Sequence, residues 1–150
     1  MNGKIISSLA NKFKSLVDGL EVEDYYKSFH TTPQHDGSPH IEIKEGKFHF
    51  VVTERGSELE RIKDLTSDEV LYLLFDGITQ YMATTYELNN RKEGIDGRSV
   101  WFPYQEMLMS NLKLEWGQRL KADHERVLVK HPFHNNAQQG ALADAEKRRG

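Results

Sequence analysis

Histidine and carboxylate side chains are the groups in this chain whose chemistry suits metal binding or acid–base catalysis. The 150 residues include seven histidines, and His35, His40 and His49 lie near one another in the sequence. A zinc site needs three or four converging ligands, usually at a short fixed spacing such as His-Glu-x-x-His. No such spacing occurs, so we predict no metal site.

Motifs for catalysis are also missing. Asp76 and Glu87 share an expected helix, but a separation of about 16 Å by helical rise is too large for a glycosidase pair. The chain has no cysteine, no serine in a Gly-x-Ser-x-Gly elbow and no glycine-rich phosphate loop. We therefore expect no catalytic residue, no cofactor, no disulfide and no enzymatic activity.

Acidic residues are concentrated in the middle of the chain. Residues 41–90 hold ten acids and five bases, a net charge of −5, whereas residues 91–130 hold eight bases and six acids. This distribution argues against direct binding of nucleic acid, which needs a basic stripe, and suits a basic protein partner. The candidate partner-binding residues are acids of an expected hairpin and the turn after it: Glu42, Glu54, Glu58, Glu60 and Asp64.

Two alternatives to this acidic surface remain open. The acids can simply form a solvated face that keeps the protein soluble. A binding site can instead lie in loop 92–98 and the basic C-terminal helices, which would suit an acidic partner surface.

Alternating apolar and polar residues predict the strands that carry the acids. Residues 41–44 and 47–53 alternate in this way, with Glu45-Gly46 between them as a tight turn. Arg55-Gly56-Ser57 is a second turn, and residues 59–63 are a candidate third strand although their apolar residues do not alternate cleanly. In the second strand Phe48, Phe50 and Val52 are expected to face inward, with His49 and Thr53 outward.

The remaining elements are helices. Residues 67–90 carry apolar side chains on nearly every side and predict a central buried helix, which Thr66 and Ser67 followed by two acids should cap. Helices are also expected at the N-terminus and over residues 99–112 and 114–129. The 99–112 helix should present an apolar face made of Val100, Tyr104, Met107 and Leu108, and Pro103 fits only with a local distortion or in its first turn.

These elements predict an α+β fold. We expect an N-terminal helix, a three-stranded antiparallel meander and three further helices packed around the central helix 67–90. Residues 1–133 should form a single domain, and the polar residues 134–150 a disordered or weakly helical tail. The first twenty residues lack the pattern of a signal peptide and no segment suits a membrane span, so we expect a cytoplasmic protein.

Glu87 and Arg91 are a further notable pair. They are four residues apart with the acid first, the favoured orientation for an ion pair on a helix. We expect this pair to fix the end of the central helix rather than to contact a partner. Trp101 and Trp116 are expected to belong to the core.

A scattered set of residues resembles a known family. The set comprises Val51-Val52-Thr53-Glu54-Arg55-Gly56, Glu58, Arg61, Leu71-Tyr72-Leu73-Leu74-Phe75, Tyr86-Glu87-Leu88-Asn89-Asn90-Arg91, Gln105, Leu108, Leu112, Trp116 and Pro132-Phe133. It looks like the immunity proteins of bacterial polymorphic toxin systems, specifically the group called immunity protein 63. The resemblance covers roughly residues 40–133, and Pro103 departs from its pattern.

The resemblance implies an antitoxin role in bacterial competition. Such proteins are encoded beside a toxin, often the C-terminal domain of a contact-dependent growth inhibition effector, and neutralise it by protein–protein interaction. The expected partner is a basic nuclease domain whose active site or substrate access the chain blocks; the oligomeric state is left open. The alternative is a small ligand-binding or regulatory domain with a pocket between hairpin and helices, lined by Tyr25, Tyr26, Tyr72 and Tyr86.

Overall fold

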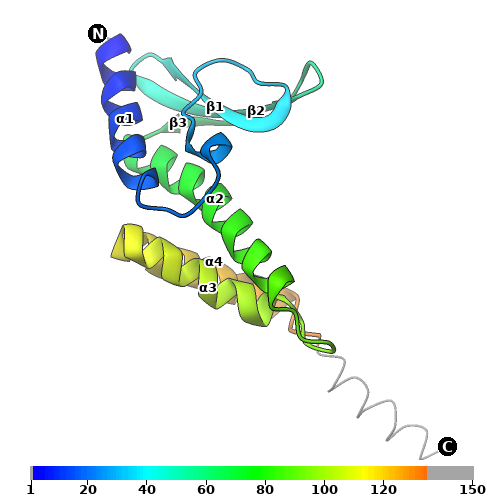
Figure 1. Cartoon of the computed structure of the whole chain (residues 1–150). Coiled ribbons are helices and arrows are strands. Elements are labelled where there is room, and N and C mark those ends of the chain that lie inside the picture. Colours follow the sequence, from blue (N-terminus) through cyan, green and yellow to red (C-terminus); the bar gives the residue numbers. More distant parts are fainter. Residues whose placement is uncertain (1, 135–150) are drawn as a thin grey trace, which may run out of the picture. The chain divides into compact units, whose positions relative to one another are not determined.

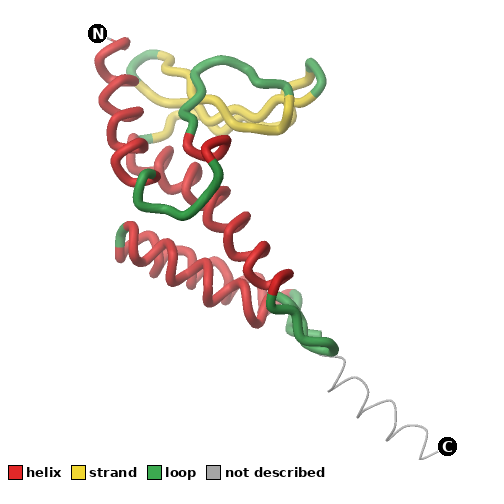
Figure 2. Tube along the Cα trace, in the orientation of Figure 1, coloured by secondary structure: helices red, strands yellow, loops and turns green. Residues whose placement is uncertain are grey.

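The computed structural model describes residues 2–134, which form four α-helices, one short 3-10 helix and a three-stranded antiparallel sheet (Figure 1, Figure 2). In chain order the elements are α1 (Asn2–Val17), η1 (Asp24–Lys27), β1 (Asp36–Lys44), β2 (Lys47–Glu54), β3 (Ser57–Leu65), α2 (Ser67–Asn89), α3 (Arg98–Leu112) and α4 (Leu114–Lys130). The expected α+β order is confirmed. The third strand is present and is longer than the expected 59–63.

The chain divides into two compact units within α2, between Asp76 and Gly77. The first unit contains α1, η1, the sheet and the first half of α2. The second contains the end of α2, followed by α3 and α4. A single domain over residues 1–133 stays a prediction, and the expected tail from residue 135 onward lies outside the described residues.

Two glycine turns join the strands in the order β1-β2-β3. Glu45 and Gly46 have φ angles of 52° and 77°, and Arg55 and Gly56 have φ angles of 50° and 83°. Two successive positive φ angles are typical of the type I′ turn, whose twist matches that of antiparallel strands. Both turns expected from the sequence are confirmed.

Apolar side chains from α1, the sheet and α2 form the core of the first unit. The ring of Phe13 lies 5.2 Å from that of Phe75 and 5.7 Å from that of Phe29. The residues buried around this aromatic cluster are Leu9, Val17, Ile41, Phe48, Leu65, Val70 and Leu71. Figure 1 shows α1 and the first turns of α2 beside the sheet.

A reciprocal cap fixes the start of α2. The Thr66 hydroxyl accepts a hydrogen bond from the Glu69 amide, and the Glu69 carboxylate accepts one from the Thr66 amide. This pair of bonds satisfies two amides that have no partner within the helix. The cap expected at Thr66 is confirmed.

The second unit is built on α3 and α4, which pack side by side (Figure 1). Its core contains Phe102, Gln105 and Met109 from α3 and Trp116, Leu120 and His124 from α4. The apolar face expected for α3 is therefore wrong, because Met107 is exposed and Gln105 is buried. Gln105 lies inside because its amide donates a hydrogen bond to the Thr79 hydroxyl of α2.

The sheet is covered more fully than the sequence predicts. His49 and Thr53 alternate with Phe48 and Phe50 as expected, but both are buried, and His49 is only 7% exposed. The expectation that they face solvent is wrong. Among residues 2–134, no helix is both long enough and apolar enough to cross a membrane.

Candidate partner-binding surface

Strand alternation separates the five acids proposed to bind a partner. Glu42 is paired with His49, Glu58 with Thr53, and Glu60 with Val52. Directly paired residues of antiparallel strands share a face, and neighbours along β2 point to opposite faces. Glu42 and Glu58 therefore lie on the His49 face, and Glu60 lies on the other.

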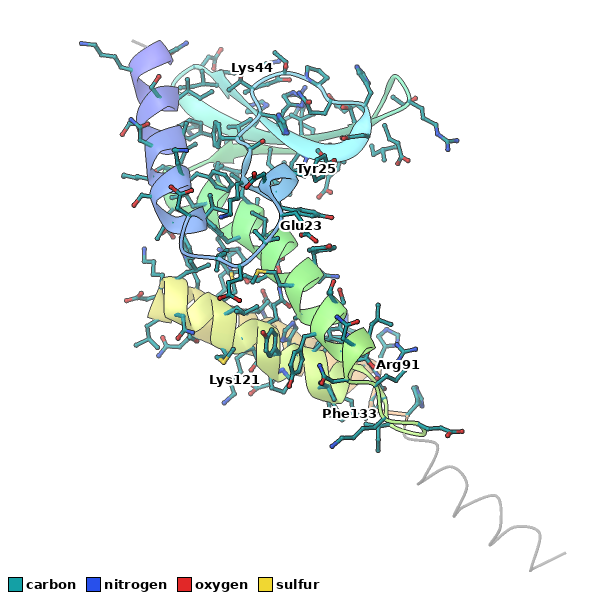
Figure 3. All side chains as sticks on the ribbon, in the orientation of Figure 1. Glu23, Tyr25, Lys44, Arg91, Lys121 and Phe133 are labelled. Carbon is teal, nitrogen blue, oxygen red and sulfur yellow. The ribbon has the colours of Figure 1, made fainter. Side chains whose placement is uncertain are left out.

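Arg61 organises the His49 face of the sheet. Its guanidinium donates to Glu42 Oε1 at 3.0 Å through Nη1 and to Glu58 Oε1 at 2.7 Å through Nη2. Further donated bonds from Nη2 and Nε reach Glu42 Oε2 and both oxygens of Glu58. Lys44 lies at the edge of this group, with Nζ 3.6 Å from Glu42 Oε1 (Figure 3).

The charges in this network compensate one another. Hydrogen bonds from Arg61, and then from His40, lower the pKa of Glu42 from 4.5 to about 2. The hydrogen bond from Arg61 also lowers the pKa of Glu58, and the two carboxylates raise the pKa of Arg61. Glu42 and Glu58 are thus firmly ionised, but they share the positive charge of the partly buried Arg61 and present less negative charge than their number indicates.

Two histidines complete the network. Arg61 Nη1 lies 3.0 Å from His49 Nδ1, and because arginine only donates, this nitrogen accepts and the ring proton lies on Nε2. His40 is 1% exposed, and its Nε2 lies 2.8 Å from Glu42 Oε2. The Nδ1 atom of His40 has no hydrogen-bond partner among the described residues. Both rings are buried, and His49 contacts Arg61 whereas His40 contacts Glu42.

Glu54, Glu60 and Asp64 are the exposed acids of the set that form no salt bridge among residues 2–134. Glu54 follows Val52 by two residues on β2, and Glu60 is paired with Val52 on β3, so the two are diagonal neighbours on one face. Both side chains are exposed, and within residues 2–134 neither forms a salt bridge. Asp64 lies four residues further along β3 and so does not join this pair.

Two bulges interrupt β3. Leu59 is the extra residue between Glu58 and Glu60, which pair with consecutive residues of β2. Lys63 and Asp64 together oppose a single residue of β2, and Asp64 has a φ of 58°. Sequence reasoning missed Leu59 as a surface residue, although the irregular alternation of residues 59–63 was the signal for it.

The alternative site in loop 92–98 is occupied by contacts within the second unit. Arg98 donates to the carbonyl oxygens of His131 and Pro132, and its guanidinium carbon lies 5.7 Å from the Phe133 ring centroid. Asp96 accepts from the Arg98 guanidinium at 2.8 Å and from the His134 amide at 2.9 Å. The hydrogen bonds from Arg98 lower the pKa of Asp96 well below its usual range. These residues tie the end of α4 to the loop.

The expected Glu87–Arg91 pair is confirmed. Two hydrogen bonds of 3.0 Å join the Arg91 guanidinium to the Glu87 carboxylate, which belongs to a residue only 5% exposed. Figure 3 places Arg91 and Phe133 at the same end of the second unit. Trp116 is buried as expected, and Trp101 packs edge-on against Phe102 and the His124 ring.

Of the four tyrosines proposed to line a pocket, Tyr25, Tyr26 and Tyr86 pack against other tyrosine rings, and Tyr72 is buried. The Tyr25 hydroxyl donates to Asp36 at 2.6 Å, which lowers the pKa of Asp36 to about 2, and the Tyr25 ring packs edge-on against Tyr26 (Figure 3). Tyr86 stacks on Tyr104 within the second unit. A hollow on the first unit is lined by α1 residues with Phe48 and Ser67, and no tyrosine lines it.

The described part of the chain contains no group of three histidines or carboxylates arranged to hold a metal ion.

A comparison with models of protein families matched the family described as Immunity protein 63 over residues 44–126, more than half of the chain. Searches for similar curated proteins and for similar solved structures gave no match.

Proposed function

Because the chain belongs to the immunity protein 63 family, we propose that it binds the nuclease domain of a cognate toxin through its acidic sheet surface and blocks its active site or access of its substrate. Membership of this family implies toxin immunity, and with it binding to a toxin. Immunity proteins of this kind are generally not enzymes. The nature of the toxin and the surface that contacts it are parts of our proposal.

The proposed surface comprises Glu42, Glu54, Glu58, Glu60 and Asp64. The observation that carries it is the uncompensated charge of Glu54 and Glu60 at the exposed end of the β2–β3 hairpin. Glu42 and Glu58 belong to the same proposed surface, and their ion pairs with Arg61 hold their carboxylates in a fixed geometry. The first unit as a whole is acidic, since residues 2–76 hold fourteen acids and nine bases.

An acidic surface is well suited to inhibiting a nuclease. Nucleases bind phosphate groups with clusters of lysine and arginine, so their substrate clefts are positively charged. A negatively charged protein is drawn toward such a cleft by long-range attraction, which raises the association rate. Once bound, the protein excludes the nucleic acid from the cleft and catalyses no reaction itself. We place this event in the cytoplasm of the cell that makes the toxin, in contact-dependent growth inhibition.

The decisive experiment is growth of bacteria that express the toxin encoded beside the gene for this chain. We expect the wild-type chain to restore growth and to bind the purified C-terminal toxin domain. Expression without rescue or binding would reject the immunity role against that toxin.

The surface is tested by charge reversal. Joint substitution of Glu54, Glu58 and Glu60 by lysine should weaken binding and abolish rescue. The matched control is Glu115→Lys with Glu125→Lys, which reverses two exposed charges of α4 and should leave binding unchanged. Unchanged affinity in the triple variant would move the toxin-binding surface elsewhere.

A further inference from the structure

We propose that Leu59, which a bulge forces out of β3, is the apolar centre of the toxin-binding surface and enters an apolar depression in a basic face of the toxin. This inference rests on the proposed function and deepens it. It adds a residue that neither the charge pattern nor the family assigns.

The bulge gives Leu59 its position. Glu58 pairs with Thr53 and Glu60 pairs with Val52, so Leu59 is left without an opposing residue on β2. An extra residue of this kind re-aims its side chain and breaks the local ladder of hydrogen bonds. Leu59 is 59% exposed, whereas Leu65 of the same strand is buried in the core. The Leu59 side chain therefore adds little to the stability of the fold.

A single exposed leucine is ordinary on a protein surface, but its neighbours here are not. The residues on both sides of Leu59 are glutamates, and Glu54 lies on the adjoining end of β2. An apolar centre surrounded by polar or charged groups is the usual arrangement of a binding interface. The negative charge of the surrounding carboxylates favours a basic partner. The nuclease toxin domain of the proposed function is such a partner, and we therefore assign this surface to it.

The two bulges of β3 also disfavour the pairing of a partner's β-strand with its exposed edge. β3 is the last strand of the sheet, and a partner strand would need an uninterrupted row of amides and carbonyls along it. The bulges at Leu59 and at Lys63 with Asp64 interrupt that row. The geometry therefore favours recognition by side chains over strand addition.

Pairing with a second copy of β3 is disfavoured by charge. In an antiparallel pair centred on Arg61, two arginines would face each other and Glu58 would lie opposite Asp64. A register centred on Glu60 would place two glutamates opposite each other. Like charges directly opposite in a sheet are destabilising.

The test is the affinity of Leu59→Ser for the purified C-terminal domain of the toxin encoded beside the gene. We expect a dissociation constant at least about ten-fold higher than that of the wild type, as for loss of an interface anchor. The melting temperature should not change, and Leu59→Met should retain affinity. If Leu59→Ser does not fold, Leu59→Ala provides the same measurement.

Leu114→Ser is the matched control, because Leu114 is 60% exposed and lies in the other unit. Its affinity should stay within about two-fold of the wild type, the usual result for residues outside an anchor. In parallel, Glu54→Gln with Glu60→Gln should slow association and reduce its dependence on salt. This result would support the role of the carboxylates around Leu59 in attracting the toxin domain.

The outcomes separate the two proposals. Wild-type binding with unchanged affinity in Leu59→Ser overturns this inference and leaves the proposed function standing. An equal loss of affinity for the toxin domain in Leu59→Ser and Leu114→Ser also overturns this inference. A wild-type dimer that Leu59→Ser converts to a monomer would assign Leu59 to self-association instead. A wild-type chain that neither binds the toxin nor protects against it rejects the proposed function, and this inference with it.

Discussion

Gly117 of α4 lies against Ser110 of α3 with no room for a side chain between them. A β-carbon at position 117 would lie 1.7 Å from Ser110 Oγ and 2.8 Å from Ser110 Cα. Only Lys113 separates α3 from α4 in the sequence, so the two helices must pack closely soon after the chain reverses. The glycine permits that approach at the cost of helix propensity.

Gly117→Ala should destabilise the protein by about 1–3 kcal/mol, the usual cost of overpacking a close contact. The free energy of unfolding in urea measures this change. Ser110→Gly should not restore full stability, because the backbone Cα of residue 110 is itself too close to the new methyl group.

Gly77→Ala is the control for that experiment. Gly77 also lies inside a helix, but a β-carbon there would meet nothing within 4 Å. Alanine has the higher helix propensity, so this variant should be more stable by about 0.5–1 kcal/mol. A loss of stability in Gly77→Ala comparable to that in Gly117→Ala would contradict the steric explanation.

The Arg61 network predicts a specific dependence of stability on pH. The pKa of Glu42 in the folded chain is about 2, below its usual 4.5, so the ionised carboxylate stabilises the fold above pH 4.5. This contribution is lost as the pH falls toward 2. Arg61→Gln should therefore be less stable than the wild type at pH 7, and the two should converge as the pH is lowered through this range.

Chemical denaturation of both proteins at a series of pH values measures the difference. Asp36 and Asp96 also have lowered pKa values, but their partners are unchanged in both proteins, so they cancel in the comparison; Glu58, whose pKa Arg61 also lowers, contributes to the difference in the same direction as Glu42. A difference in the free energy of unfolding that stays constant from pH 7 to pH 2 would rule out a pH-dependent role for the Glu42–Arg61 pair.

Arg98 is predicted to protect the end of α4 from opening. Arg98→Gln removes the guanidinium that donates to the carbonyls of His131 and Pro132, so the amides of Lys130, His131, Phe133 and His134 should exchange faster with deuterium. Hydrogen exchange followed by mass spectrometry of the corresponding peptide measures this. Lys121→Gln, at an exposed position of α4 labelled in Figure 3, should leave the rate unchanged.

The Glu87–Arg91 pair predicts an order of stabilities. Arg91→Met leaves the Glu87 carboxylate buried without the bonds that neutralise it. A buried charge without a partner is more costly than a neutral amide at the same place. The melting temperature of Arg91→Met should therefore rise when Glu87→Gln is added. A further decrease on adding the second substitution would contradict the proposed role of the pair.

Local interactions of the fold were readily predicted from sequence. The turns at Glu45-Gly46 and Arg55-Gly56, the cap at Thr66 and the Glu87–Arg91 pair each depend on residues within four positions of one another. Their geometry is set by backbone preferences and helix spacing, which periodicity captures.

Interactions between elements were predicted less well. Gln105 is buried because of a hydrogen bond to Thr79, which lies twenty-six residues earlier in the chain. His49 is buried because Arg61, from another strand, satisfies its ring nitrogen. In both cases a polar residue looks exposed until its partner is known.

The candidate surface was predicted in composition but not in arrangement. The sequence named the five acids without dividing them between the faces of the sheet, and the bulge at Leu59 alters the register between Glu58 and Glu60. Bulges leave only a weak signal in a single sequence, and the neutralising effect of Arg61 depends on contacts across three strands. Of the five acids, Glu54, Glu60 and Asp64 are exposed without a salt bridge among residues 2–134, whereas Glu42 and Glu58 share Arg61.

The Arg61 guanidinium therefore reduces the net negative charge on one face of this sheet. Replacing Arg61 by a neutral side chain would raise the net negative charge of this face by one and would release the carboxylates of Glu42 and Glu58 from their common partner. On the surface proposed to bind the toxin, a substitution at position 61 would change the electrostatic attraction to the partner while the five acids themselves stay the same.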